Sequence, residues 1–237
     1  MGKGGTRREA GYGSGSGCGM NAECRRLLGE IAAEAQLTAF LTGRAAFSPR
    51  VMQAMADVPR EEFVPKESRA LAYLDQPLPI GHGQTISQPY IVALMTDLLD
   101  LSPGDKVLEV GAGSGYQAAV LAHLAGQVHT VEIVPELARS CRDRLARQGL
   151  CQVTVHAGDG AAGLLKEAPF DAIMVTAAAP RIPPALVDQL KSGGRMVIPL
   201  GDPWSTQELM WLNKSEAGEV AMQSVLSVRF VPLTGEW

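Results

Sequence analysis

Two periodicities of hydrophobic and polar residues organise the chain. From residue 106 onward, short apolar runs of strand length alternate with segments whose apolar residues recur at helical spacing. The expected strands cover 106–110, 128–133, 152–159, 172–177 and 195–200, and the expected helices cover 116–125, 135–148 and 183–190. This alternation predicts a doubly wound α/β fold, in which helices cover both faces of a mainly parallel sheet. Two more strands, near 208–213 and 221–233, follow without a helix between them, so the sheet should end in an antiparallel pair.

The part of the chain before this alternation has a different composition. Residues 1–20 are rich in Gly and Ser, which predicts a disordered leader. One helix is expected after Asn21, a residue that can serve as its N-cap, and a second near 50–57. The stretch 58–89 contains five prolines and is expected to be mostly irregular, and a third helix should begin near Gln88 with its apolar residues on one face. We therefore expect a leader at 1–20, a helical and loop extension at 21–87 that covers the site, and a main domain at 88–237.

Composition narrows the class of protein. Apolar residues make up 46% of the chain, and 21 basic against 25 acidic side chains give a formal net charge of −4. The sequence has no basic cluster of the kind that holds a phosphate backbone, so nucleic acid is not an expected partner. It also has no apolar run long enough to span a bilayer and no signal-like apolar segment, which leads us to expect a cytoplasmic protein without membrane contacts. We expect a monomer, although no pattern in the sequence determines the oligomeric state. The cysteines and histidines do not show metal-site spacing, so no metal is expected.

A glycine-rich loop follows the first strand of the main domain. Gly111, Gly113 and Gly115 lie between that strand and the next helix, where missing Cβ atoms let a ligand approach the backbone. The dinucleotide fingerprint requires a small residue where this chain has Tyr116, which makes a dehydrogenase the less favoured interpretation. Close packing of the helix on the strand would also favour glycine here, so the loop alone does not establish a binding site.

Three acidic residues lie in or just after the first three strands, toward the same expected edge of the sheet. Glu132 ends the second strand, where a carboxylate can accept both hydroxyls of a ribose, although strand ends are often polar for other reasons. Asp159, beside Gly160, could accept from an adenine amino group or could simply form a turn. Glu109, among apolar neighbours in the first strand, needs a partner such as a ligand ammonium group or a backbone donor. A ligand with an adenine, a ribose and a cationic amino-acid end suits this set, and S-adenosylmethionine has all three.

Several longer segments form a recognisable set: VPREEFVP at 58–65, AYLDQPLPIG at 72–81, GQTISQPYIVALMTDLL at 83–99, PGDKVLEVGAGSGYQAAVLA at 103–122, PFDAIMVTAAAP at 169–180 and VRFVPL at 228–233. Together, over about 51–236, they resemble one enzyme family, the protein-L-isoaspartate O-methyltransferases. The resemblance implies a seven-stranded Rossmann-like methyltransferase sheet and transfer of a methyl group from S-adenosylmethionine to the free carboxylate of isoaspartyl residues in damaged proteins. Repair would then proceed through a succinimide.

The resemblance also implies roles for individual residues. Ser87, in the segment Thr-Ile-Ser-Gln-Pro, corresponds to the family's active-site serine, although a serine before a helix is also a natural N-cap. The cofactor positions fall on Gly111, Gly113, Gly115, Glu132 and Asp159. The segment VRFVPL resembles the one that lines the peptide cleft in relatives, and the implied substrate-binding residues are Thr85, Ile86, Gln88, Val231 and Pro232.

The implied chemistry agrees with the residues present. A carboxylate with a pKa near ~4 is ionised at pH 7, so its attack on a sulfonium methyl needs no general base. Two alternatives remain open from the sequence. The first is a methyltransferase of the same fold with a small-molecule or nucleic-acid acceptor, because the fold does not determine the acceptor. The second is a non-catalytic binding module that retains the cofactor pocket.

Overall fold

The computed structural model describes residues 21–202 and 205–235. The predicted disordered leader at 1–20 lies outside the described residues. Among the residues described, no helix is long and apolar enough to cross a membrane.

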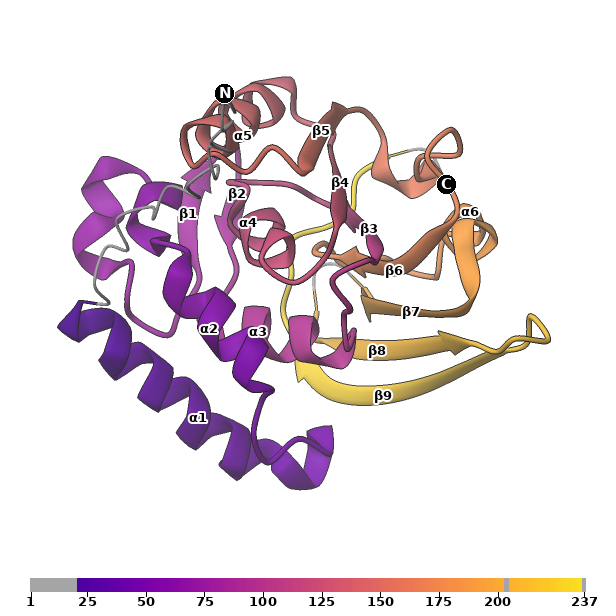
Figure 1. Cartoon of the computed structure of the whole chain (residues 1–237), viewed down its shortest axis with the longest axis horizontal. Coiled ribbons are helices and arrows are strands. Elements are labelled where there is room, and N and C mark those ends of the chain that lie inside the picture. Colours follow the sequence, from indigo (N-terminus) through magenta and orange to yellow (C-terminus); the bar gives the residue numbers. More distant parts are fainter. Residues whose placement is uncertain (1–20, 203–204, 236–237) are drawn as a thin grey trace, which may run out of the picture.

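A seven-stranded sheet with the strand order β5-β4-β3-β6-β7-β8-β9 forms the centre of the molecule (Figure 1). Its strands are β3 (Lys106–Val110), β4 (Gln127–Glu132), β5 (Val153–Ala157), β6 (Phe170–Val175), β7 (Leu190–Leu200), β8 (Gln207–Lys214) and β9 (Val220–Val228). The five strands from β5 to β7 are parallel, whereas β8 pairs antiparallel with both of its neighbours. The predicted parallel core and terminal antiparallel pair are confirmed.

Helices pack on both faces of this sheet. They are α1 (Ala22–Thr42), α2 (Pro49–Asp57), α3 (Pro89–Leu98), α4 (Tyr116–Ala122), α5 (Pro135–Arg147) and α6 (Pro184–Gln189). The central strand β3 shows why two apolar layers form: Val107 belongs to the buried cluster that contains residues of α1 to α5, whereas Leu108 and Val110 belong to the cluster that contains α6. Strands that are buried on both faces read as continuous apolar runs, as this one does.

The amino-terminal extension adds a third layer outside α3. The side chain of Asn21 accepts a hydrogen bond from the Cys24 amide at 2.6 Å, which confirms Asn21 as the N-cap of α1. Helices α1 and α2 both pack on α3 (Figure 1). As a result all ten residues of α3 are buried, including those on the side that the sequence pattern assigned to solvent.

The prediction that residues 58–89 are mostly irregular is wrong. They form two 3₁₀ helices, η1 (Arg60–Phe63) and η2 (Lys66–Leu71), and a hairpin of β1 (Leu78–Gly81) and β2 (Gln84–Ile86). The hairpin turns at His82 and Gly83, which both have positive φ. Prolines are tolerated because they lie at the ends of these short elements or in a two-stranded ribbon, where few backbone amides need a partner.

The last predicted strand, 221–233, is too long. Strand β9 ends at Val228, and the following residues leave the sheet edge and cross to the centre of the sheet. There the Ala178 amide donates to the Val231 carbonyl and the Leu233 amide donates to the Ala178 carbonyl, both at 2.8 Å. Pro232 lacks an amide hydrogen and cannot continue a strand ladder, so this segment is free to lie across the carboxyl ends of the strands.

Candidate active site

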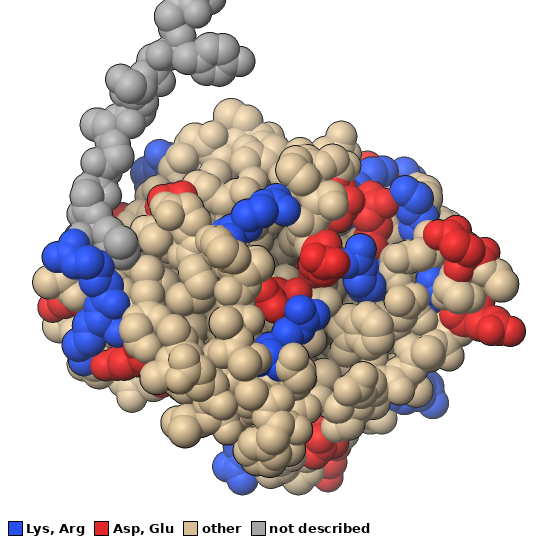
Figure 2. Space-filling view, turned by 60° about the horizontal axis from the view of Figure 1, so that its bottom comes forward, with Lys and Arg blue, Asp and Glu red and all other residues tan. Residues whose placement is uncertain are grey.

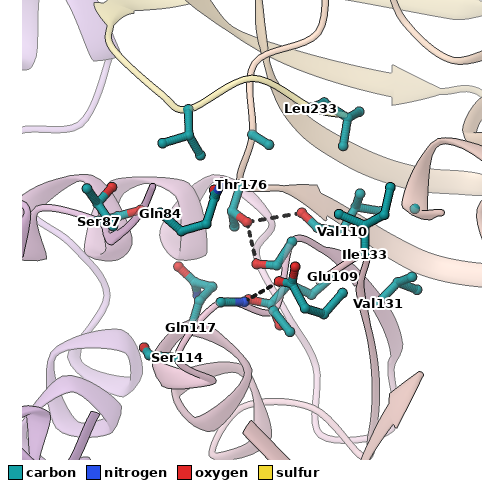
Figure 3. A pocket seen from close by; sticks show the side chains of 18 of the residues that line it. Gln84, Ser87, Glu109, Val110, Ser114, Gln117, Val131, Ile133, Thr176 and Leu233 are labelled. Carbon is teal, nitrogen blue, oxygen red and sulfur yellow. Dashed lines mark hydrogen bonds between the residues drawn. The ribbon is translucent and has the colours of Figure 1, made fainter. Parts of the chain in front are cut away.

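The site lies where the strand order of the sheet reverses. The chain passes from β3 to β4 on one side and later places β6 on the other side of β3, so the loops after β3 and β6 diverge. A cavity of about 750 Å³, including its open mouth, occupies this position. It is lined by residues 84–87, 109–114, 131–133, 176–177 and 231–234 together with Val92, Tyr116, Gln117 and Gly160, and Figure 3 shows part of this lining. We call it the first cavity.

All three glycines of the loop have positive φ, a conformation that other residues adopt with strain. Gly111 has φ +100°, and a Cβ atom there would lie 2.5 Å from Thr176 Oγ1; Gly113 has φ +52°. The Thr176 hydroxyl donates to the Val110 and Gly111 carbonyls at 3.0 and 2.7 Å, as Figure 3 shows for the end of β3. The glycines therefore let the loop pass close to β6 while its backbone stays open to the cavity.

The other two predicted glycines play different parts. Gly115 is not among the residues that line the cavity, and a Cβ atom there would lie 2.8 Å from Cys141 Sγ on α5. Its position is explained by helix packing, the alternative considered from the sequence. Gly160 does line the cavity, and a Cβ atom there would lie 2.4 Å from Val110 Cγ1.

Glu132 is held at the end of β4 by two backbone amides. Its Oε2 accepts from the Gly113 amide at 2.7 Å and its Oε1 accepts from the Val134 amide at 2.9 Å. The side chain is buried and lines the cavity. Since each carboxylate oxygen can accept two hydrogen bonds, both oxygens retain capacity for the hydroxyls of a ligand.

Glu109 is completely buried, and neither of its carboxyl oxygens has a hydrogen-bond partner among the described residues. Burial, with a smaller contribution from the charge of Glu132, raises the pKa of Glu109 to about 8. An unpaired buried carboxyl group requires an explanation, because such groups almost always have partners. Glu109 lines the first cavity, so a ligand donor there would supply the missing partner.

Asp159 is not among the residues that line the cavity. Its Oδ1 accepts from the Ala161 amide at 2.9 Å and caps the short helix η3 (Gly160–Ala162). Asp159 therefore has the turn-forming role that was one of the two interpretations of the sequence. Contact of Asp159 with an adenine stays a prediction.

A second cavity, of about 1160 Å³ with its open mouth, adjoins the first. It is lined by Glu34 and Thr38 of α1, by Pro77, Gln88, Tyr90 and Ile91, by Thr206, and by residues 226–230. Thr85, Ser87, Thr176 and Val231 line both cavities. Of the predicted substrate-binding residues, Thr85, Gln88 and Val231 therefore reach the second cavity, whereas Ile86 and Pro232 line only the first.

Ser87, half-buried at this junction, does not cap α3. The N-cap position is Gln88, and the cap is supplied from elsewhere: Asp75 Oδ1 accepts from the Tyr90 amide at 2.8 Å and Asp75 Oδ2 accepts from Gln88 Nε2 at 3.1 Å. The capping role considered for Ser87 is thus wrong, and its hydroxyl makes no hydrogen bond to any described residue. Figure 3 shows Ser87 at the start of α3, across the cavity from Glu109.

Sequence reasoning missed several residues of the site. Thr176 follows β6 at the carboxyl edge of the sheet, so the strand pattern could have indicated it. Glu34 and Asp75 gave no such signal, because their places depend on how the extension folds over α3. Burial and the adjacent Asp75 raise the pKa of Glu34 to about 7.

One face of the molecule shows charges of both signs (Figure 2). On the face shown in Figure 2, basic and acidic side chains are interspersed over a largely uncharged surface. A continuous basic surface, the usual footprint of phosphate-backbone binding, does not occur on that face.

Comparison with known proteins gives consistent matches over most of the chain. The sequence model described as protein-L-isoaspartate(D-aspartate) O-methyltransferase matches residues 33–237. A protein-L-isoaspartate O-methyltransferase 1 from Cupriavidus necator is 58% identical over 207 residues, which is 87% of this chain and 80% of that protein. A protein-L-isoaspartate O-methyltransferase 2 from Polaromonas sp. is 55% identical over 210 residues, 89% of this chain and all of that protein.

Solved structures agree with the sequence matches. A protein-L-isoaspartate O-methyltransferase superposes with a TM-score of 0.77 at 27% identity, over 90% of this chain and 66% of that chain. A putative enzyme of the same name from Plasmodium falciparum, in complex with S-adenosyl-L-homocysteine, has a TM-score of 0.74 at 24% identity, over 90% and 99% of the two chains, and supports the fold.

Proposed function

Because the chain belongs to the protein-L-isoaspartate(D-aspartate) O-methyltransferase family, we propose that Ser87 holds the acceptor carboxylate where its two cavities meet. The chain is an S-adenosylmethionine-dependent enzyme that methylates isoaspartyl residues in protein repair. The observation that carries the residue assignment is that Ser87 lines both cavities while its hydroxyl has no hydrogen-bond partner among the described residues. These properties suit a group that donates to a bound anion.

The first cavity fits the cofactor in its chemistry. Glu109, a buried carboxyl group without a partner, would accept from the amino group, and Glu132 would accept from the ribose hydroxyls. The backbone of Gly111 and Gly113 would form the cradle, while Asp159 and Gly160 would contact the adenine. When bound, S-adenosylmethionine supplies a methyl group activated by a sulfonium charge.

The second cavity is our proposed acceptor site. An isoaspartyl residue presents a free carboxylate that is already ionised at neutral pH, so the protein needs to align it and not to deprotonate it. Ser87 would donate one hydrogen bond to that carboxylate, and Thr85 and Val231 would line its path. Alignment of this kind can supply roughly 7–11 kcal/mol of the barrier reduction.

The second cavity is compatible with a polypeptide substrate. A cavity lined by α1, Gln88 and the segment after β9 has room for an extended polypeptide on either side of the isoaspartyl residue. We propose isoaspartyl-containing proteins and peptides as partners. The ester made there can close to a succinimide, because the following amide nitrogen attacks the ester carbonyl and methanol leaves.

Two peptides of identical sequence that differ only in the linkage of one aspartate test this function. Each is incubated with the protein and S-adenosylmethionine labelled in the methyl group, and base-labile label on the peptide is counted. We expect label on the isoaspartyl peptide only, and binding of S-adenosylhomocysteine by calorimetry. Label on both peptides alike, or on neither despite cofactor binding, would contradict the proposal.

A further inference from the structure

Arg60 is a buried cation that the mechanism above does not use. Its side chain is 1% exposed, it belongs to the segment VPREEFVP, and it forms no ion pair with any described carboxylate. One of its terminal nitrogens, Nη1, is buried without a hydrogen-bond partner in the described structure. Removing an unpaired guanidinium from water is costly, so its position requires a compensating role.

The remaining donors of Arg60 all point to backbone carbonyl groups. Its Nε donates to the Ala72 carbonyl at 3.0 Å, and its Nη2 donates to the carbonyls of Gln76 at 3.4 Å and Ser87 at 2.7 Å. The Ser87 contact is the shortest of the three. One side chain therefore joins the loop before β1 to the residue that follows β2.

Ser87 has few other constraints on its backbone. Strand β2 ends at Ile86 and α3 begins at Pro89, so Ser87 lies in neither element. Within the described residues, the hydrogen bond from Arg60 is the only one that its carbonyl accepts. The orientation of the Ser87 side chain depends on the peptide plane that this bond holds.

Arg60 also reaches the cofactor side of the site. Its guanidinium carbon lies 4.8 Å from the centre of the Tyr116 ring, an attractive cation–π arrangement. Tyr116 is the first residue of α4 and directly follows the glycine loop. The Arg60 guanidinium thus contacts both the carbonyl of Ser87 and the first residue of α4, the helix that follows the glycine loop.

We propose that Arg60 is a positioning residue for methyl transfer, which holds the backbone of Ser87 at a fixed place relative to the glycine loop. The inference rests on the proposed role of Ser87. Lysine cannot replace arginine here, since an ammonium group lacks the planar fork that reaches several carbonyls at once and stacks on a ring. Because a displacement of about 1 Å can cost about 100-fold in rate, loss of this fork should act on turnover.

A double-mutant cycle tests the proposal. The variants are Arg60→Lys, Ser87→Ala and the pair, with Arg50→Lys as the matched control. Arg50 donates to the Leu101 and Leu124 carbonyls at 2.7 and 3.0 Å. Neither Arg50 nor these two partners is among the residues that line the two cavities. Turnover of an isoaspartyl peptide is divided by the number of S-adenosylhomocysteine sites titrated in the same sample, so a smaller folded fraction does not lower the value. Arg60→Gln is measured in the same way if the lysine variant accumulates poorly.

We expect Arg60→Lys to lower turnover per site by about 10- to 100-fold, with Arg50→Lys within about twofold of wild type. In the Ser87→Ala background the same change at Arg60 should cost less than about threefold, because a residue that acts through Ser87 has nothing left to position. The inference would be overturned if the loss of turnover in the double variant equalled the product of the two single losses, or if the Arg60 variants kept wild-type turnover. Either result would leave the role of Ser87 intact. Wild-type turnover in Ser87→Ala would instead refute the proposed role of Ser87, and the inference with it.

Discussion

Asp75 caps α3, whereas we propose that Ser87 acts in catalysis, and two alanine variants should separate these roles in the laboratory. Asp75 accepts from the Tyr90 amide and from Gln88, whereas the Ser87 hydroxyl accepts nothing from α3. Ser87→Ala should therefore change the free energy of unfolding by less than about 0.5 kcal/mol. Its turnover should fall by more than about tenfold, which corresponds to about 1.4 kcal/mol of lost transition-state stabilisation.

Asp75→Ala should behave in the opposite way in unfolding experiments. Loss of an N-terminal cap costs about 1 kcal/mol, and loss of the bond from Gln88 costs about 1 kcal/mol more. Since 1 kcal/mol moves the Tm of a chain this long by about 2–4 °C, the expected fall in Tm is about 4–8 °C. Asp75→Asn is the matched control, because its side-chain oxygen can still accept from the Tyr90 amide; it should lose roughly half as much or less.

The assay is thermal unfolding without ligand, monitored by circular dichroism, together with isoaspartyl-peptide turnover for each variant. Cofactor-free protein is used so that weaker cofactor binding does not lower the Tm. If Ser87→Ala lowered the Tm as much as Asp75→Ala while retaining wild-type turnover, the hydroxyl would be the cap and the assignment of both residues would be refuted.

Three further predictions concern buried or crowded groups of the two cavities. Since the pKa of Glu34 is raised to about 7, its carboxyl group becomes negatively charged as the pH rises from 6 to 8. The KM for an anionic isoaspartyl peptide should therefore rise over that range in the wild type but stay constant in Glu34→Gln. The same dependence of KM on pH in both proteins would contradict this. Glu109 has a pKa of about 8 against an ordinary value of 4.5, so the native state holds a proton that the unfolded state has lost, and stability should fall as the pH rises through that window. Urea unfolding should then show that Glu109→Gln gains stability over the wild type at pH 8.5 but not at pH 4, and an equal difference at both pH values would exclude this explanation. Gly160→Ala places a Cβ atom 2.4 Å from Val110 Cγ1 and should lower the free energy of unfolding by about 1–3 kcal/mol. The double variant with Val110→Ala should be more stable than the sum of the two single losses predicts. Strict additivity of the two losses would show that the two side chains do not collide.

The sequence by itself determined the features that depend on neighbouring residues. The apolar run of β3 predicts a strand buried on both faces, and Asn21 predicts the start of α1, because burial pattern and capping act over a few positions. The glycine loop with Glu132 after the next strand likewise predicted the place of the first cavity, since the carboxyl ends of parallel strands meet at one edge.

Only the tertiary structure decided which long-range partners meet. The cap of α3 comes from Asp75, not from the adjacent Ser87, and the buried cation Arg60 reaches a carbonyl 27 residues away. The segment after Val228 crosses the sheet instead of extending a strand, and α3 is buried on every side because α1 and α2 cover it. These outcomes depend on which groups the folded chain brings together. The free energy of a helix cap, a buried charge or a covered helix face depends on the group that it contacts in space, and not on the residues next to it in the sequence.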